Sequence, residues 1–131
     1  MAEHNATESQ HGSLVLSISA STRGSTVAIT AVLRNVGPRP WEYTIGGDLP
    51  PVLQIAVRDA KGNKLYGWQP PFASAYWRSI RSLEPGASIT QTAEVTAQGV
   101  VYARAWVAQL EGFQTEEIEV VLPGPDANDE P

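Results

Sequence analysis

Short runs in which apolar and polar residues alternate, each ended by glycine, proline or asparagine, recur along most of this chain. Alternation with a period of two is typical of β-strands that bury one face, because successive side chains point to opposite sides of a sheet. The pattern predicts about eight strands and no amphipathic helix. We expect the strands at residues 14–19, 27–33, 41–45, 53–57, 64–68, 89–95, 101–107 and 118–122.

The residues between these runs favour tight turns. Residues 59–63 have the composition of a hairpin connection, with Gly62 free to adopt a positive φ. Pro85 and Gly86 suit the two central positions of a type II turn. Residues 69–80 show no clear period and are expected to be the least regular part of the domain.

An immunoglobulin-like antiparallel β-sandwich of about seven to nine strands accommodates this pattern best, because each sheet must bury one face against another. A small closed barrel is the alternative. The chain has four Trp, four Tyr and no Cys, so we expect aromatic packing rather than disulfides to hold the sheets together. Trp41, Trp68 and Trp106 are the aromatic residues expected in the core.

The 131 residues are enough for one domain. We expect the folded unit to span residues 13–122. Residues 1–12 contain almost nothing that could enter a core, and residues 123–131 are acidic and rich in proline, so both ends are predicted to be disordered tails.

The charge balance excludes some classes of partner. A net charge of −5 disfavours nucleic acid as a partner, because nucleic acid selects basic surfaces.

No run approaches the ~20 apolar residues of a membrane helix, so we expect no membrane insertion. The first residues lack the apolar core of a signal peptide. The protein would be cytoplasmic if the chain is complete, and secreted or envelope-associated if it is a mature segment.

Catalytic chemistry has little support in the sequence. The two histidines, His4 and His11, fall in the expected N-terminal tail, where no packed partners could hold them in a catalytic triad. The absence of Cys removes thiol catalysis and Cys-based zinc sites. Glu111, Glu116, Glu117 and Glu119 are close in sequence, but such a run is more typical of a solvated face or a protected sheet edge. We expect no enzyme activity, no cofactor and no metal.

Four segments follow one another in a characteristic order: Leu33-Arg34-Asn35-Val36-Gly37, the run from Val57 to Trp68, Leu83-Glu84-Pro85-Gly86-Ala87-Ser88-Ile89, and Gly99-Val100-Val101-Tyr102. Taken together, they resemble the BsuPI family, the bacterial intracellular proteinase inhibitor domain. The resemblance covers roughly residues 26–110. It implies an immunoglobulin-like sandwich and the inhibition of proteases, but it assigns no inhibitory residue.

Two segments outside the expected strands are candidate binding loops, residues 46–51 and 69–74, the second lying within an aromatic-rich stretch that ends at Arg78. Their prolines should stiffen them, and Trp, Tyr and Arg are common interface anchors. The candidate contact residues are Asp48, Leu49, Pro50, Pro70, Pro71, Phe72, Tyr76, Trp77 and Arg78.

These loops predict a module that binds another protein, with a protease as the named candidate. We expect the module to be a monomer. Two other functions remain open. One is a carbohydrate-binding module, because exposed aromatic residues on sandwich folds can bind sugars. The other is a structural or envelope-associated accessory domain.

Overall fold

The computed structural model describes residues 6–68 and 77–123, which form ten β-strands. The strands are β1 (Ala6–His11), β2 (Leu14–Arg23), β3 (Thr26–Asn35), β4 (Trp41–Gly46), β5 (Leu53–Asp59), β6 (Lys64–Tyr66), β7 (Arg78–Leu83), β8 (Ser88–Thr96), β9 (Gly99–Val107) and β10 (Ile118–Leu122). These residues contain no helix with the length and hydrophobicity needed to cross a membrane.

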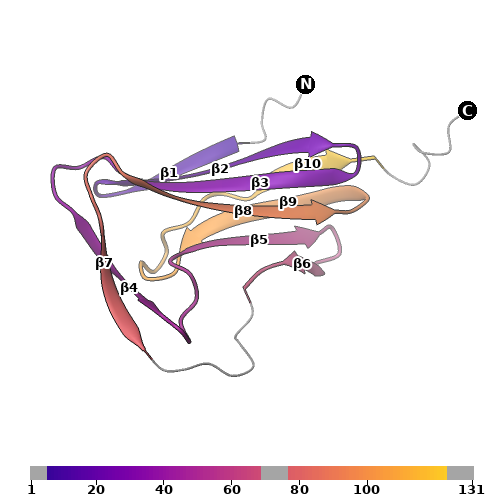
Figure 1. Cartoon of the computed structure of the whole chain (residues 1–131). Helices are drawn as coiled ribbons and strands as arrows, with labels where there is room; N and C mark the ends of the chain where they lie inside the picture. The colour runs from indigo at the N-terminus through magenta and orange to yellow at the C-terminus, as the bar shows by residue number, and fades with distance from the viewer. Residues whose placement is uncertain (1–5, 69–76, 124–131) are drawn as a thin grey trace, which may run out of the picture.

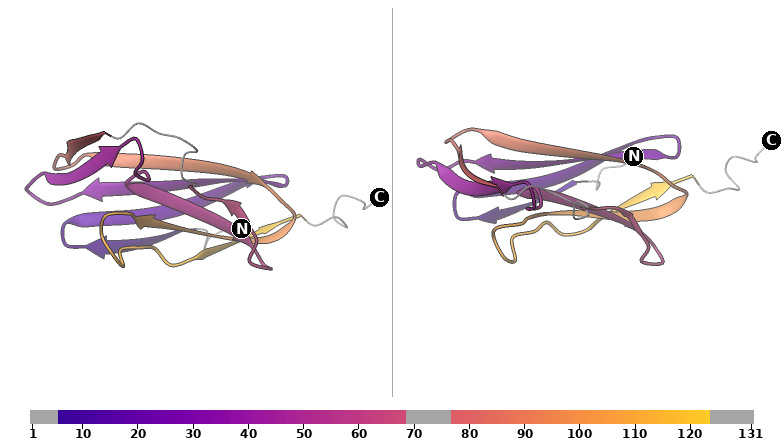
Figure 2. Two further views of the ribbon diagram at one scale, coloured as in Figure 1. Left: turned by 90° about the horizontal axis from the view of Figure 1, so that it is seen from below. Right: turned by 60° about the horizontal axis from the view of Figure 1, so that its bottom comes forward.

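Eight of the strands form two stacked antiparallel sheets (Figure 1). One sheet has the order β1-β2-β3-β8 and the other the order β10-β9-β5-β6. Figure 2 shows the same two layers from two further directions. The predicted antiparallel β-sandwich is therefore confirmed. The turns predicted around Gly62 and Gly86 are also present, and both glycines have positive φ values, 92° and 82°.

The core between the sheets is aliphatic rather than aromatic. Its largest fully buried side chains include Leu16, Ile29, Leu33 and Ile55. Phe113 is the one aromatic residue among the buried residues that the structure describes. Facing sheets lie only about 10 Å apart, a gap that interdigitating aliphatic side chains can fill.

The prediction that Trp41, Trp68 and Trp106 lie in the core is wrong. None of the four tryptophans is buried. Trp106 lies on the outer face of β9, because Ala105 and Val107 on either side of it face inward and are buried. Trp41 is half-buried at the margin of the core. Trp68 is half-buried and does not belong to the core cluster.

Part of the expected N-terminal tail is ordered, which corrects the predicted boundary at residue 12. β1 pairs with β2 from Ala6, opposite Ser19, to His11, opposite Leu14. A polar edge strand needs few buried side chains, because backbone hydrogen bonds to its neighbour hold it. The ring of His11 also packs against that of Phe113 in a tilted arrangement, with ring centroids 5.3 Å apart. Residues 1–5 and 124–131 of the two expected tails lie outside the described residues.

The remaining two strands, β4 and β7, form a separate two-stranded sheet, called the ribbon below. It runs steeply across one end of the sandwich (Figure 1). β7 was not predicted, because its sequence has only two apolar residues, Ile80 and Leu83, and these do not alternate with a period of two. Pairing with β4 makes it a strand, in register from Trp41, opposite Leu83, to Gly46, opposite Arg78.

Asn35 ties the base of the ribbon to the sandwich. Its side chain is fully buried and its Nδ2 donates to the carbonyl oxygens of Arg39 (2.7 Å) and Leu83 (2.9 Å). Its Oδ1 accepts from the amide of Gly37 (3.0 Å), and its carbonyl accepts from that of Gly86 (2.7 Å). The Asn35-x-Gly37 turn and the Pro85-Gly86 turn, far apart in sequence, are therefore parts of one hydrogen-bonded unit.

Candidate functional site

In the structure, the first candidate loop, residues 46–51, lies next to Arg78, where the aromatic-rich stretch ends. Arg78 Nη1 and Nη2 bond the two carboxylate oxygens of Asp48, the Nη2 bond measuring 3.3 Å. The loop at 46–50 and residues 77–78 therefore meet where the ribbon ends. We call these residues the ribbon tip. Four candidates, Pro70, Pro71, Phe72 and Tyr76, lie outside the described residues.

The backbone at the ribbon tip is closely packed. Gly46 lies opposite Arg78 in the strand register. A Cβ atom at Gly46 would sit 2.6 Å from the carbonyl oxygen of Trp77, so any other residue would force the strands apart. The amide of Leu49 donates to the carbonyl of Gly46 (3.3 Å), which closes the turn after β4. Glycine at position 46 and the Asp48–Arg78 pair together fix the geometry of the tip.

The hydrogen bond from Arg78 holds the pKa of Asp48 below its ordinary value near 3.8. Both side chains are partly exposed, with 34% and 40% of the surface of Arg78 and Asp48 accessible. Water screens such a pair, so its main effect is to orient the two loops rather than to stabilise the fold.

This pair gives a pH prediction. In the folded protein the Asp48 carboxyl should titrate below pH 3.8, because the ionised form is the one that bonds Arg78. A carboxyl with a lowered pKa contributes stability above its ordinary pKa and loses it as the pH falls through the folded pKa. In Arg78→Gln the midpoint should rise towards 3.8. A ¹³C NMR titration of the carboxyl carbon measures both, and equal midpoints in the two proteins would contradict the pairing in solution.

A groove lies beside the ribbon on the β4 side. Thr44, Leu49, Pro50, Ala108 and Gln109 line it, and its volume is about 410 Å³. The Gln109 side chain bonds the backbone of Thr44 twice, accepting from its amide (2.9 Å) and donating to its carbonyl (2.5 Å). Gln109 thus occupies the outer edge of β4 at this point. No sequence pattern pointed to Ala108 or Gln109, because they lie in a turn that packs on β4 only in the tertiary structure.

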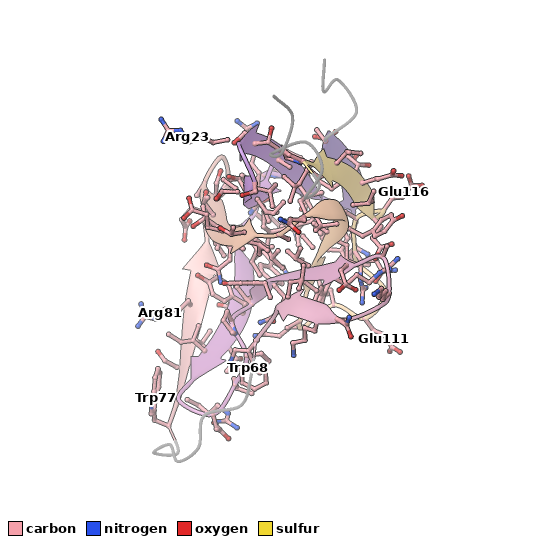
Figure 3. The ribbon with its side chains drawn as sticks, turned by 90° about the vertical axis from the view of Figure 1, so that its right-hand side faces the viewer. Arg23, Trp68, Trp77, Arg81, Glu111 and Glu116 are labelled. Atoms are coloured by element: carbon pink, nitrogen blue, oxygen red, sulfur yellow. The ribbon has the colours of Figure 1, made fainter. Side chains whose placement is uncertain are left out.

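The β7 side of the ribbon carries exposed apolar and cationic side chains. Trp77 is 46% exposed and Ile80 is 70% exposed. Trp77 and Arg81 project to the same side, away from the body of the protein (Figure 3). Sequence reasoning identified Trp77 but missed Ile80 and Arg81, because it did not predict the strand that presents them.

A second aromatic surface lies on the outer face of the β10-β9-β5-β6 sheet. The Arg58 guanidinium lies 4.4 Å from the ring centroid of Tyr102 and bonds both oxygens of Glu117 at 2.9 Å. Arg104 lies 4.9 Å from the ring centroid of Trp106. One face of each ring is therefore covered by a guanidinium.

Glu117, one of the four clustered acidic residues, is accounted for by this ion pair. Its hydrogen bond from Arg58 lowers its pKa below the ordinary value. Within residues 6–68 and 77–123, no group of three His, Asp or Glu side chains is placed to hold a metal ion.

Comparisons with known proteins give no family. No family model and no curated protein matches the chain. Among solved structures, β-glucosidase 3B from Thermotoga neapolitana, in complexes with glucose and with α-D-glucose, matches with 15% sequence identity and a TM-score of 0.45. The match covers 90% of this chain but only 16% of the β-glucosidase chain. Similarity at this level carries no argument about function.

Proposed function

We propose that this chain is a non-enzymatic module that binds another protein, and that it is a proteinase inhibitor of the BsuPI type. The observation that supports the proposal is the Asp48–Arg78 pair, which places a candidate loop beside the exposed Trp77 at one tip. The sequence resemblance suggests the inhibitor class, and the ribbon tip is the surface that we expect to contact the protease.

The ribbon tip has the properties that a binding protrusion needs. The ribbon runs across the end of the sandwich instead of packing face to face within it (Figure 1). Asn35 fixes its base, and the Asp48–Arg78 pair and Gln109 fix its far part. A segment held in one conformation loses less conformational entropy on binding. Trp and Arg are also the residues that most often dominate binding energy at interfaces.

The carbohydrate-binding alternative has less support. A sugar platform needs aromatic rings with exposed faces. Trp41 and Tyr43 do stack, with centroids 5.4 Å apart, but both are half-buried and pack against the core. The rings of Tyr102 and Trp106 each have one face covered by arginine. The ribbon tip therefore supports a protein-binding function better than these surfaces support sugar binding.

Inhibition of a panel of serine, cysteine and metalloproteases tests the proposal. We expect the purified chain to inhibit at least one protease, and Trp77→Ala to raise the inhibition constant at least tenfold, or about 1.4 kcal/mol. Replacing residues 46–51 and 69–74 by Gly-Ser sequences should weaken inhibition further.

Trp106→Ala is the matched control, because it removes the same side chain from the outer face of β9. It should inhibit as the wild type does. Inhibition that persists with Trp77 and both loops replaced would refute the proposed surface. A complete absence of inhibition across the panel would refute the inhibitor function.

A further inference from the structure

The two edges of the ribbon differ. The outer edge of β4 is occupied by the Gln109 side chain. Among the described residues, no strand pairs with the outer edge of β7. A strand edge of this kind presents backbone donors and acceptors to any extended segment that reaches it.

The register identifies which backbone groups face outward. Thr44 directs both its amide and its carbonyl to Gln109, away from β7. Thr44 lies directly opposite Ile80. In an antiparallel pair, two opposed residues either bond each other twice or both point outward. The amide and carbonyl of Ile80 therefore point to the outer edge, and by alternation so do those of Arg78 and Ser82.

The side chains of β7 are a mixture of apolar, small polar and basic residues. Ile80 is 70% exposed and Trp77 precedes the strand. β7 contains two arginines and no acidic residue, although the whole chain has a net charge of −5. Within residues 6–68 and 77–123, Arg81 has no carboxylate within ion-pair distance. The edge thus combines the outward backbone groups of Ile80 and Ser82, an exposed apolar side chain and the positive charge of Arg81.

We propose that β7 binds an extended acidic segment of the partner protein as an added β-strand. This inference rests on the proposed protein-binding function and names the mode of contact. An apolar side chain of the segment lies beside Ile80, and carboxylates on its other face lie near Arg81, because neighbouring residues of a strand point to opposite faces. A second copy of this chain fits less well, because pairing β7 with β7 would bring Arg81 of both copies onto one short ladder.

Fluorescence anisotropy with labelled six-residue peptides tests this mode of binding. The Val-Glu-Val-Glu-Val-Glu peptide should bind, and Val-Lys-Val-Lys-Val-Lys should not. Binding should weaken at least tenfold in Arg81→Glu and as the salt concentration rises. Equal binding of the two peptides, or no binding of the acidic one, would overturn the proposal.

N-methylation of the acidic peptide tests the backbone pairing. Only alternate amides of an added strand face β7, so methylating either all Val or all Glu amides should abolish binding, while the other pattern should preserve it. If both methylated peptides bind equally, the segment does not bind as a strand.

Two variants locate the site. Ile80→Pro removes the outward amide and should abolish peptide binding. Ile80→Thr keeps a β-branched residue, should weaken peptide binding, and serves as the test if the proline variant does not fold. Val121→Thr is the control, because Val121 is equally exposed, at 68%, on edge strand β10. Equal effects of the two threonine variants would place the site elsewhere.

The two proposals can fail separately. Protease inhibition that is sensitive to Trp77, without binding of the acidic peptide, would leave the proposed function intact and reject strand addition. Peptide binding at β7 without inhibition of any protease would reject the inhibitor function alone. Dimers in analytical ultracentrifugation that disappear in Ile80→Thr but persist in Val121→Thr would show that the edge binds a second copy, which overturns the external partner.

Discussion

Leu33→Ala should lower the free energy of unfolding by about 2–5 kcal/mol, the range for removing a fully buried leucine side chain. Leu33 is 0% exposed and lies opposite Leu16 on the inner face of its sheet. The substitution leaves a cavity between two sheets that backbone hydrogen bonds hold in place. Urea denaturation followed by circular dichroism measures the change.

Trp106→Ala is the informative comparison for Leu33→Ala. Although it removes a larger side chain, Trp106 lies on the outer face of β9 against Arg104, so we expect a loss of about 1 kcal/mol or less. A larger loss for Trp106→Ala than for Leu33→Ala would show that the aromatic residues, and not the aliphatic core, hold the sandwich together.

Asn35→Ala should cost about 2–4 kcal/mol of stability. It deprives the carbonyls of Arg39 and Leu83 and the amide of Gly37 of their hydrogen-bond partner at a buried or half-buried site. We also expect hydrogen exchange to accelerate in β4 and β7 more than in β2 and β3, because the lost bonds hold the base of the ribbon.

Asn63→Ala is the matched control for Asn35→Ala. The Asn63 side chain also makes a hydrogen bond, to Asp59 Oδ2 at 2.9 Å, but in an exposed hairpin where water can replace it. It should cost less than about 1 kcal/mol. Equal losses for the two variants, or uniform acceleration of exchange across all strands, would contradict the specific role of Asn35.

Local pattern was sufficient for most of the fold. The alternation of Leu14, Leu16 and Ile18, and that of Val101, Ala103 and Ala105, correctly identified which side of each strand faces the core. Both glycine turns followed from composition, because positive φ is a property of the residue and its immediate neighbours. These features depend on a few adjacent residues, and they can be inferred without knowing the tertiary structure.

The candidate site was only partly predictable. Asp48, Leu49, Pro50, Trp77 and Arg78 were identified because they belong to proline-rich or aromatic-rich segments. Ile80, Arg81 and Gln109 were missed. Their importance depends on the pairing of β7 with β4 and on the packing of the turn at Gln109 against β4. Neither contact produces a periodic pattern in the sequence.

The same distinction explains β1 and the tryptophans. β1 is polar and gives no sign of burial, yet it is held as a strand by the backbone of β2. The tryptophans suggested a core because large aromatic residues favour burial, but the sheets meet through alanine, valine, leucine and isoleucine instead.

The class of fold, the inward faces of the main strands and the principal turns can all be inferred from the amino-acid sequence, because each is a local consequence of side-chain alternation and backbone freedom. Three features appear only once the chain is folded: a two-stranded ribbon crosses the end of the sandwich, Asn35 anchors its base, and Asp48 and Arg78 meet at its tip. These contacts join residues some 30 to 50 positions apart. Their formation depends on strand register and on how the chain closes its loops, which no local pattern specifies.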